Sequence, residues 1–133
     1  MADVISNTSP LQYLHQVRQL ELLPRLCGTV IVPTAVVAEL DVGRRAGIDL
    51  PDVTRAAWAI IKTPAAAPVL GWLSDIGPGE AGVLALAHEM PGAIAVLDDA
   101  RARAVARARG IPIVGTLGLL VQAKSRNLIE IIE

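Results

Sequence analysis

The stretch Val4-Ile5-Ser6-Asn7-Thr8-Ser9-Pro10-Leu11 predicts a short strand that runs directly into a helix. Its first two residues are apolar, which is typical of a buried parallel strand. Ser9 is the expected helix N-cap and Pro10 the first helical residue, where a missing N–H is harmless. The chain therefore turns at Asn7 and Thr8. Open α/β sheets place their ligands at such junctions, so acidic residues elsewhere in the chain become informative.

The composition predicts one domain over residues 1–133, since the chain is 53% hydrophobic and long enough for a sizeable core. No apolar run reaches the roughly 18 residues of a membrane helix, and the N-terminus lacks a signal-peptide pattern. We therefore expect a soluble, cytoplasmic protein that does not interact with a membrane. The single cysteine, Cys27, excludes an internal disulfide. A net charge of −1 gives no global attraction to nucleic acid.

Strand-like segments alternate with helical segments along the chain. The strand-like segments start at Val4, Thr29, Ala93 and Ile113. This alternation predicts an α/β fold with a parallel sheet and right-handed crossovers, in which all strands end at one edge. Helices are expected on both faces of the sheet.

Two segments in the middle of the chain are harder to interpret. Pro51-Asp52 predicts the start of a helix that continues through Trp58 to Ile61. Thr63–Pro68 then interrupts it, and Val69–Leu73 is a short apolar element whose type stays open.

Oxygen-bearing side chains converge on the predicted sheet edge. Asn7 and the Asp98-Asp99 pair follow strands, Glu80 heads a helix, and Glu39 follows the second strand by about two helical turns. Carboxylate and amide oxygens are the ligands that a hard divalent cation prefers, so these residues are candidate metal ligands.

Structural explanations for the acids also exist. A carboxylate in a first helical turn is stabilised by the helix dipole, which would account for Glu80. Asp99 and Arg103 form an i,i+4 pair. Glu39 could be a helix-surface carboxylate beside Asp41.

Five motifs together resemble the PIN domain, and more narrowly the uncharacterised PIN branch akin to VapC toxins. They are Ser6-Asn7-Thr8-Ser9-Pro10-Leu11, Val32-Pro33 with Glu39, Gly77-Pro78-Gly79-Glu80-Ala81, Leu97-Asp98-Asp99-Ala100-Arg101 and Ile113-Val114-Gly115-Thr116-Leu117-Gly118. The resemblance covers nearly the whole chain in the right order. It implies a three-layer α/β/α sandwich, an acidic cluster that binds Mg²⁺ or Mn²⁺, and hydrolysis of RNA phosphodiesters, usually by the toxin of a type II toxin–antitoxin pair.

The resemblance assigns roles to individual residues. The family's first acid falls on Asn7, its second on Glu39, its third on Glu80 and its fourth on Asp98 or Asp99. The spacing to Val105-Ala106 favours Asp99, whereas Asp98 is nearer to the strand. Ser9 matches a small hydroxyl residue that commonly follows the first acid, and Thr116 lies at the same sheet edge.

Asn7 departs from the family, because most members have aspartate there. An amide oxygen still ligates a cation but contributes no charge, so the site is expected to bind metal more weakly. Two hypotheses follow. The first is an active metal-dependent endoribonuclease, and the second is a degenerate PIN-fold module that binds RNA or a protein. A nucleotide-binding sandwich of another kind is disfavoured, because no GxGxxG loop follows any strand.

Local basic residues are the expected contacts to RNA. They are Arg44 and Arg45 after the Glu39 helix, and Arg101 and Arg103 after the aspartate pair. Solvated surface arginines are the alternative explanation. The expected protein partners are a cognate antitoxin and a second copy of the chain, because the aliphatic excess suggests a covered surface.

Overall fold

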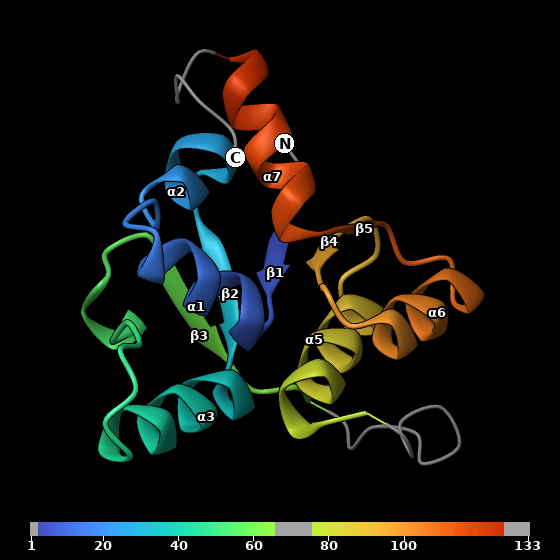
Figure 1. Cartoon of the computed structure of the whole chain (residues 1–133). Helices are drawn as coiled ribbons and strands as arrows, with labels where there is room; N and C mark the ends of the chain where they lie inside the picture. The colour runs from blue at the N-terminus through green and yellow to red at the C-terminus, as the bar shows by residue number, and fades with distance from the viewer. Residues whose placement is uncertain (1–2, 66–75, 127–133) are drawn as a thin grey trace.

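The computed structural model describes residues 3–65 and 76–126, which build a five-stranded, all-parallel sheet between helices (Figure 1). The strand order is β3-β2-β1-β4-β5. The strands are β1 (Val4–Ser6), β2 (Val30–Pro33), β3 (Ala59–Lys62), β4 (Ile94–Val96) and β5 (Ile113–Val114). The predicted parallel sheet is thus confirmed. That the whole chain forms one domain stays a prediction.

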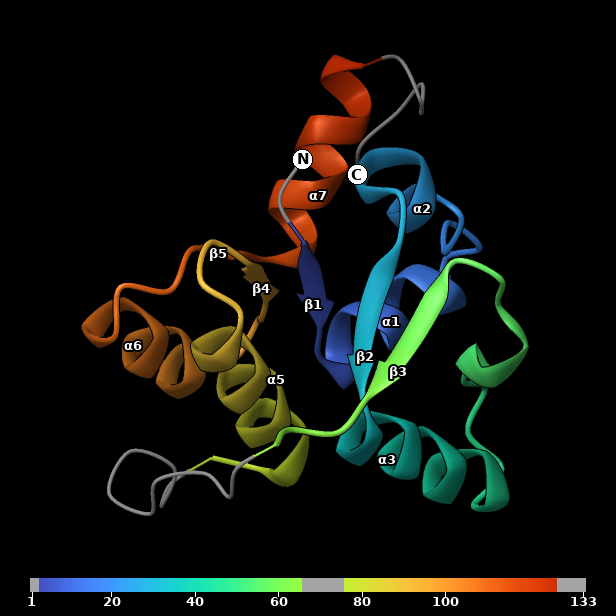
Figure 2. The same cartoon turned by 180° about the vertical axis from the view of Figure 1, so that it is seen from behind.

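Among the described residues, six helices flank the sheet, and a short 3₁₀ turn, η1 (Val53–Arg55), precedes β3. The helices are α1 (Thr8–Gln16), α2 (Leu22–Cys27), α3 (Thr34–Arg45), α5 (Pro78–Glu89), α6 (Ala100–Ala108) and α7 (Thr116–Ser125). Figures 1 and 2 show α1, α2 and α7 on one face of the sheet and α5 and α6 on the other. The predicted three-layer α/β/α sandwich is therefore confirmed.

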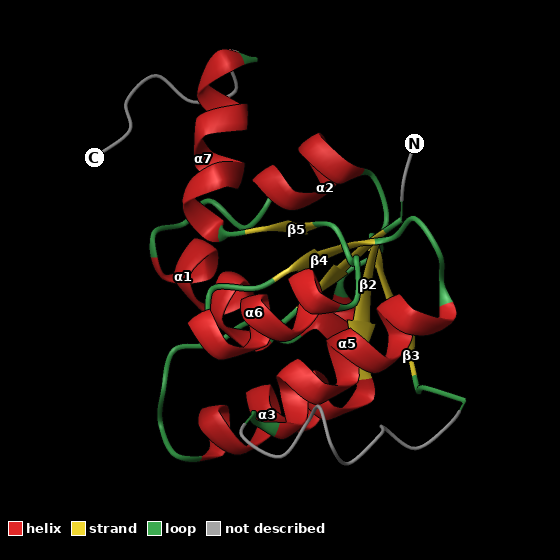
Figure 3. Cartoon of the chain, turned by 90° about the vertical axis from the view of Figure 1, so that its right-hand side faces the viewer, coloured by secondary structure: helices red, strands yellow, loops and turns green. Residues whose placement is uncertain are grey.

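Helix α3 lies at the carboxyl edge of the sheet, where it contacts both α1 and α5 (Figure 2). Figure 3, coloured by secondary structure, shows the strands between the two helical layers. Helix α5 approaches β2 closely, because a Cβ added at Gly82 would lie only 3.0 Å from Pro33 Cβ. This close approach brings the first turn of α5 to the end of β1.

Aliphatic side chains fill the interior of the sandwich. Ile5, Leu11, Leu84 and Leu97 are fully buried, and each such side chain contributes about 1.5–3 kcal/mol when it leaves water. Ile5 lies two positions before Asn7, and Leu97 lies directly before Asp98. Packing of the core therefore fixes the backbone from which Asn7 and Asp98 project.

The helix expected over Pro51–Ile61 is wrong, because residues 59–62 form the edge strand β3. Asp52 caps only the η1 turn, where its side chain accepts a hydrogen bond from Thr54 N. Ala56 is extended, with φ −86° and ψ 122°. The β-branched Ile60 and Ile61 then pair with Ile31 and Val32 of β2.

The boundaries of two helices also differ from the expectation. Helix α1 begins at Thr8, so its N-cap is Asn7 rather than Ser9. The helical spacing of Leu11, Leu14, Val17 and Leu20 predicts a helix through Leu20. This extension is wrong, because α1 ends at Gln16 and Arg18 takes φ +60°. Helix α3 extends to Arg45, so Arg44 and Arg45 lie in its last turn and not in a loop.

The apolar element expected at Val69–Leu73 lies outside the described residues, as does the end of the Thr63–Pro68 segment. Across residues 3–65 and 76–126, no helix has the length and hydrophobicity needed to cross a membrane.

Candidate functional site

Asn7 is the buried polar residue at the carboxyl end of the central strand β1. Its backbone N–H donates to Val96 O at 3.1 Å, which holds it against β4. The residue is 2% exposed, and its side chain makes no capping bond to α1. Among the residues that the structure describes, Asn7 Oδ1 is buried without a hydrogen-bond partner. An unsatisfied buried acceptor costs about 1–3 kcal/mol, so this atom calls for an explanation.

Glu39 reaches the same place from α3. Its Oε1 atom accepts a hydrogen bond from Thr8 Oγ1 at 2.7 Å, across 31 positions of sequence. The residue is half-buried and lines a hollow of about 430 Å³ with Ala35, Val42 and Pro78 among its walls. The Glu39 carboxylate is thus both anchored inside and accessible from the surface.

Gly79, in the first turn of α5, faces these two side chains. A Cβ added at Gly79 would overlap Glu39 Oε1 and would lie 2.8 Å from Asn7 Oδ1. The amide oxygen and the carboxylate oxygen therefore border one small space that any side chain at this position would fill. The backbone of the first turn of α5 forms its third wall.

Asp98 stands at the same edge, one strand away. Ser6 pairs with Val96 in the β1–β4 register, so Asp98 lies just beyond the neighbour of Asn7. Its Oδ1 accepts from Thr116 N at 2.8 Å and its Oδ2 from Thr116 Oγ1 at 2.6 Å. The start of α7 therefore holds both oxygens of this carboxylate. We call Asn7, Glu39, Gly79 and Asp98 the edge centre.

Arg103 lies close to Asp98. Its Nη1 donates to Leu97 O at 2.9 Å. A Cβ added at Gly115 would be 3.0 Å from both Arg103 Nη1 and Asp98 Oδ1. The guanidinium thus contributes positive charge beside the edge centre, whereas Arg101 is exposed on α6.

Asp99 and Glu80 turn toward their own helices. Asp99 is the N-cap of α6, and its Oδ2 accepts from Ala102 N at 2.9 Å. Glu80 folds back over the first turn of α5, because its Oε2 would be 2.9 Å from a Cβ added at Gly77. The positive end of a helix dipole stabilises the negative charge of each carboxylate. In the described ranges, 3–65 and 76–126, no three His, Cys, Asp or Glu side chains gather as a metal-binding group.

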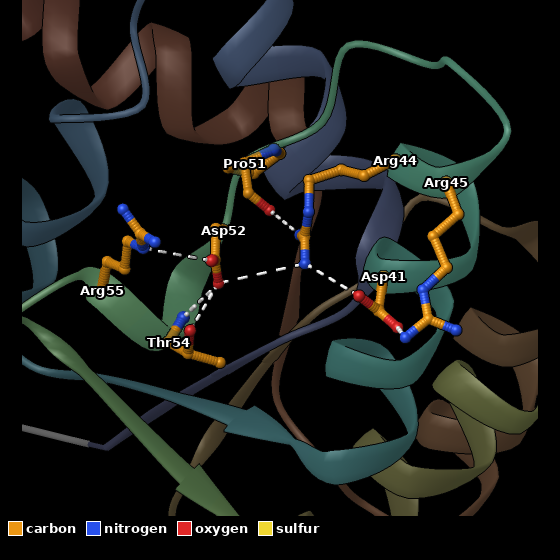
Figure 4. A network of polar contacts seen from close by, with 7 residues as sticks. All are labelled: Asp41, Arg44, Arg45, Pro51, Asp52, Thr54 and Arg55. Atoms are coloured by element: carbon orange, nitrogen blue, oxygen red, sulfur yellow. Dashed lines mark hydrogen bonds and ion pairs between the residues drawn. The ribbon is translucent and has the colours of Figure 1, made fainter.

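A second polar cluster, the surface network, lies on the other side of α3 (Figure 4). Arg44 donates to Pro51 O at 2.7 Å and pairs with Asp41 at 3.3 Å, and Arg45 pairs with Asp41 at 3.1 Å. Asp52 bonds to Thr54 and pairs with Arg55 at 3.5 Å. The hydrogen bond from the Thr54 side chain, with smaller help from the nearby arginines, lowers the pKa of Asp52. Arg44 therefore ties the Pro51–Arg55 segment to α3.

The sequence motifs did not single out Thr8 or Gly79 as site residues. Both belong to motifs quoted for the resemblance, but hydroxyl contacts to Glu39 are not visible in a sequence. Ser9, which was expected to supply the hydroxyl, is half-buried in the first turn of α1.

A family model described as DUF3368, a PIN domain, matches residues 3–133, nearly the whole chain. The chain belongs to the PIN-domain family. No curated protein gives a significant match to the sequence. PIN domains have a nuclease-type fold and generally use divalent metal ions. In this PIN domain the edge centre occupies the carboxyl ends of β1 and β4, where an open parallel sheet binds its ligands.

Proposed function

We propose that this PIN domain is a metal-dependent endoribonuclease that hydrolyses RNA phosphodiesters. The observation that carries the proposal is Asn7 Oδ1, a buried acceptor without a partner among the described residues, which faces Glu39 Oε1 across the space at Gly79. Two neighbouring oxygens with no donor between them repel one another. A bound cation would turn this repulsion into coordination.

The donor set fits Mg²⁺ or Mn²⁺. Asn7 would supply a neutral oxygen, and Glu39 and Asp98 would supply charged ones, which are the ligand types that hard cations prefer. A divalent cation bound there supplies charge that polarises a phosphodiester and favours ionisation of the attacking water. The role of the protein is to hold these oxygens in place before substrate arrives, through Thr8 for Glu39 and Thr116 for Asp98.

The charge of the edge centre argues for weak metal binding without substrate. Asn7 is neutral, Glu80 folds over Gly77, and Asp99 caps α6. A phosphate oxygen of the RNA would complete the ligand set in this proposal. The basic side of the centre supports the same substrate, because Arg103 stands beside Asp98 and Arg101 is exposed on the same helix.

A role as the toxin of a type II toxin–antitoxin pair is the finer part of the proposal. It rests on the resemblance of the sequence motifs to VapC proteins. A homodimer and an antitoxin partner belong to the same proposal. Exposed apolar side chains support a covered surface, with Val17 59% exposed on the α1 side and Leu117 67% exposed on α7.

One observation favours a second candidate, a PIN fold that binds RNA or protein without catalysis. A carboxamide rotated by half a turn presents N–H donors where Oδ1 now lies. An Asn7 amide in that orientation would donate to Glu39 and close the edge centre without a cation. An ionised aspartate at this position has no N–H to donate to Glu39. A substitution at residue 7 therefore distinguishes the two candidates.

The test combines Mn²⁺ titration with RNA cleavage in the wild type, Asn7→Asp and Glu39→Gln. For a nuclease, we expect Mn²⁺ to raise the melting temperature by mass action. Asn7→Asp should enlarge the rise and accelerate cleavage, and Glu39→Gln should weaken both. For a PIN fold without catalysis, Asn7→Asp should lower stability in EDTA, and none of the three proteins should cleave RNA. Failure of all three proteins to respond to Mn²⁺ would exclude the metal-dependent proposal.

A further inference from the structure

Thr8 links the end of β1 to a carboxylate of a distant helix. It is the first residue of α1 and follows Asn7 directly. Its hydroxyl donates to Glu39 Oε1 at 2.7 Å. The residue that follows the unpartnered amide is thus the one that holds the neighbouring acid.

Glu39 depends strongly on this hydroxyl. Among the residues that the structure describes, Thr8 supplies the only hydrogen bond to the Glu39 carboxylate. A glutamate side chain has several rotatable bonds and loses much rotamer freedom when it is fixed. Without the hydroxyl, the carboxylate is free to swing into the hollow lined by Val42 and Pro78.

The oxygen that Thr8 holds is the one that borders the edge centre. Glu39 Oε1 is the atom that a Cβ at Gly79 would overlap, and Asn7 Oδ1 lies on the same side of that position. The hydrogen bond therefore fixes the orientation of the carboxylate toward the amide. A neutral donor does this without cancelling the negative charge, which an arginine in its place would do.

Asp98 offers a comparison within the same centre. Thr116 holds it twice, through the side-chain Oγ1 at 2.6 Å and through the backbone N–H at 2.8 Å. A substitution at Thr116 removes only the first of these bonds. Glu39 has no such backbone donor among residues 3–65 and 76–126, so its orientation is the more sensitive of the two.

We propose that Thr8 is a positioning residue that keeps Glu39 turned toward Asn7 and thereby sets the metal affinity of the edge centre. This proposal rests on the proposed function. Hydrogen-bond partners of metal ligands typically change metal affinity by about 10–100-fold when they are removed. The hydroxyl of Thr8 is the group to which we assign that effect here.

The experiment measures the Mn²⁺ dissociation constant without RNA, by electron paramagnetic resonance of free Mn²⁺. Thr8→Val keeps the shape of the side chain and removes the donor, and Thr8→Ala serves as a second variant without a hydroxyl. We expect both to weaken binding about tenfold or more. Thr8→Ser should restore the wild-type value. Thr116→Val is the matched control. It should lower Mn²⁺ affinity less than Thr8→Val does, because the backbone N–H of residue 116 still donates to Asp98.

A double-mutant cycle with Glu39→Ala separates positioning from general structural damage. Removing the hydroxyl should have no further effect on Mn²⁺ affinity once the carboxylate is gone. An equal loss in the Glu39→Ala background would overturn the proposal, as would a Thr8→Val protein with wild-type affinity. If Glu39→Ala weakens Mn²⁺ binding and Thr8→Val does not, only the role of Thr8 fails. If the wild type binds no Mn²⁺, the proposed function and this role fail together.

Discussion

Helix α3 carries two carboxylates, Glu39 and Asp41, that belong to two different kinds of polar cluster. Two positions on a helix are separated by about 200°, so the two side chains leave α3 on opposite sides. Glu39 faces the edge centre, where its contact is the Thr8 hydroxyl. Asp41 faces the surface network, where it pairs with Arg44 and Arg45 (Figure 4).

The two clusters differ in whether their charges are balanced. In the surface network each carboxylate has an arginine within 4.0 Å. In the edge centre, no ion pair among residues 3–65 and 76–126 includes Glu39 or Asp98, and Asn7 Oδ1 has no donor. A satisfied polar cluster stabilises the fold. An unsatisfied, buried one indicates a place that binds something else.

Gly79→Ala should give the largest effect, because it fills the space of the edge centre. The new methyl group would overlap Glu39 Oε1 and push it away from Asn7. We expect the Mn²⁺-induced rise in melting temperature to vanish, together with any RNA cleavage. The measurement is thermal unfolding with Mn²⁺ and with EDTA, so that each variant serves as its own reference.

Gly82→Ala is the matched control for this variant. It lies in the same helix, and its Cβ would meet Pro33 Cβ at 3.0 Å rather than a site oxygen. Its melting temperature in EDTA is expected to change, but its response to Mn²⁺ should match the wild type. A Gly79→Ala protein that keeps the full Mn²⁺ response would show that the edge centre is no more a binding site than the surface network.

The position of the edge centre could be predicted from sequence because parallel strands end together. Asn7 and Asp98 each follow a buried apolar strand, and the alternation of strands and helices predicts one common edge. The same logic failed for β3. Ile60 and Ile61 form a short apolar run, which strands and helices share, and only pairing with β2 selects the extended form.

Contacts inside the edge centre could not be predicted in the same way. The hydrogen bond from Thr8 to Glu39 spans 31 positions and depends on how α3 crosses α1. The N-cap role of Asp99 and the fold of Glu80 over Gly77 depend on side-chain orientation. Spacing along the chain limits which residues meet, but rotamers decide what each carboxylate touches.

Arg44 and Arg45 provide a test of moderate size, because they share Asp41 but differ in burial. Arg44 is 29% exposed and also donates to Pro51 O, whereas Arg45 is 80% exposed. Arg44→Ala should lower the free energy of unfolding by about 1–2 kcal/mol, since it loses a charged hydrogen bond to the backbone. Arg45→Ala should lower it by about 0.3–0.5 kcal/mol, as exposed helix pairs do. Urea unfolding measures both.

Arg45→Ala also tests the expected contacts to RNA. If the arginines of the surface network serve only the fold, the salt dependence of RNA binding should be unchanged in folded Arg45→Ala protein. A flatter dependence would assign Arg45 to the RNA surface and weaken the contrast between the two clusters. Arg101→Ala is the comparison variant, and we expect it to flatten the dependence.

The smallest expected effect concerns Asp52, and it tests whether the surface network serves to stabilise the fold. Its pKa is lowered chiefly by the hydrogen bond from the Thr54 side chain. A pKa that is lower in the folded protein than in the unfolded chain adds stability at pH values above the unfolded pKa, about 3.9. This stability is lost as the pH falls through the folded pKa.

Thr54→Val should therefore raise the pKa of Asp52 and reduce the loss of stability between neutral and acidic pH. Carboxyl-carbon NMR titration measures the pKa directly, with Arg45→Ala as the control, because Arg45 does not contribute to the shift. An Asp52 pKa that stays low in Thr54→Val would show that the backbone N–H of residue 54 and the arginines, rather than the hydroxyl, balance this carboxylate.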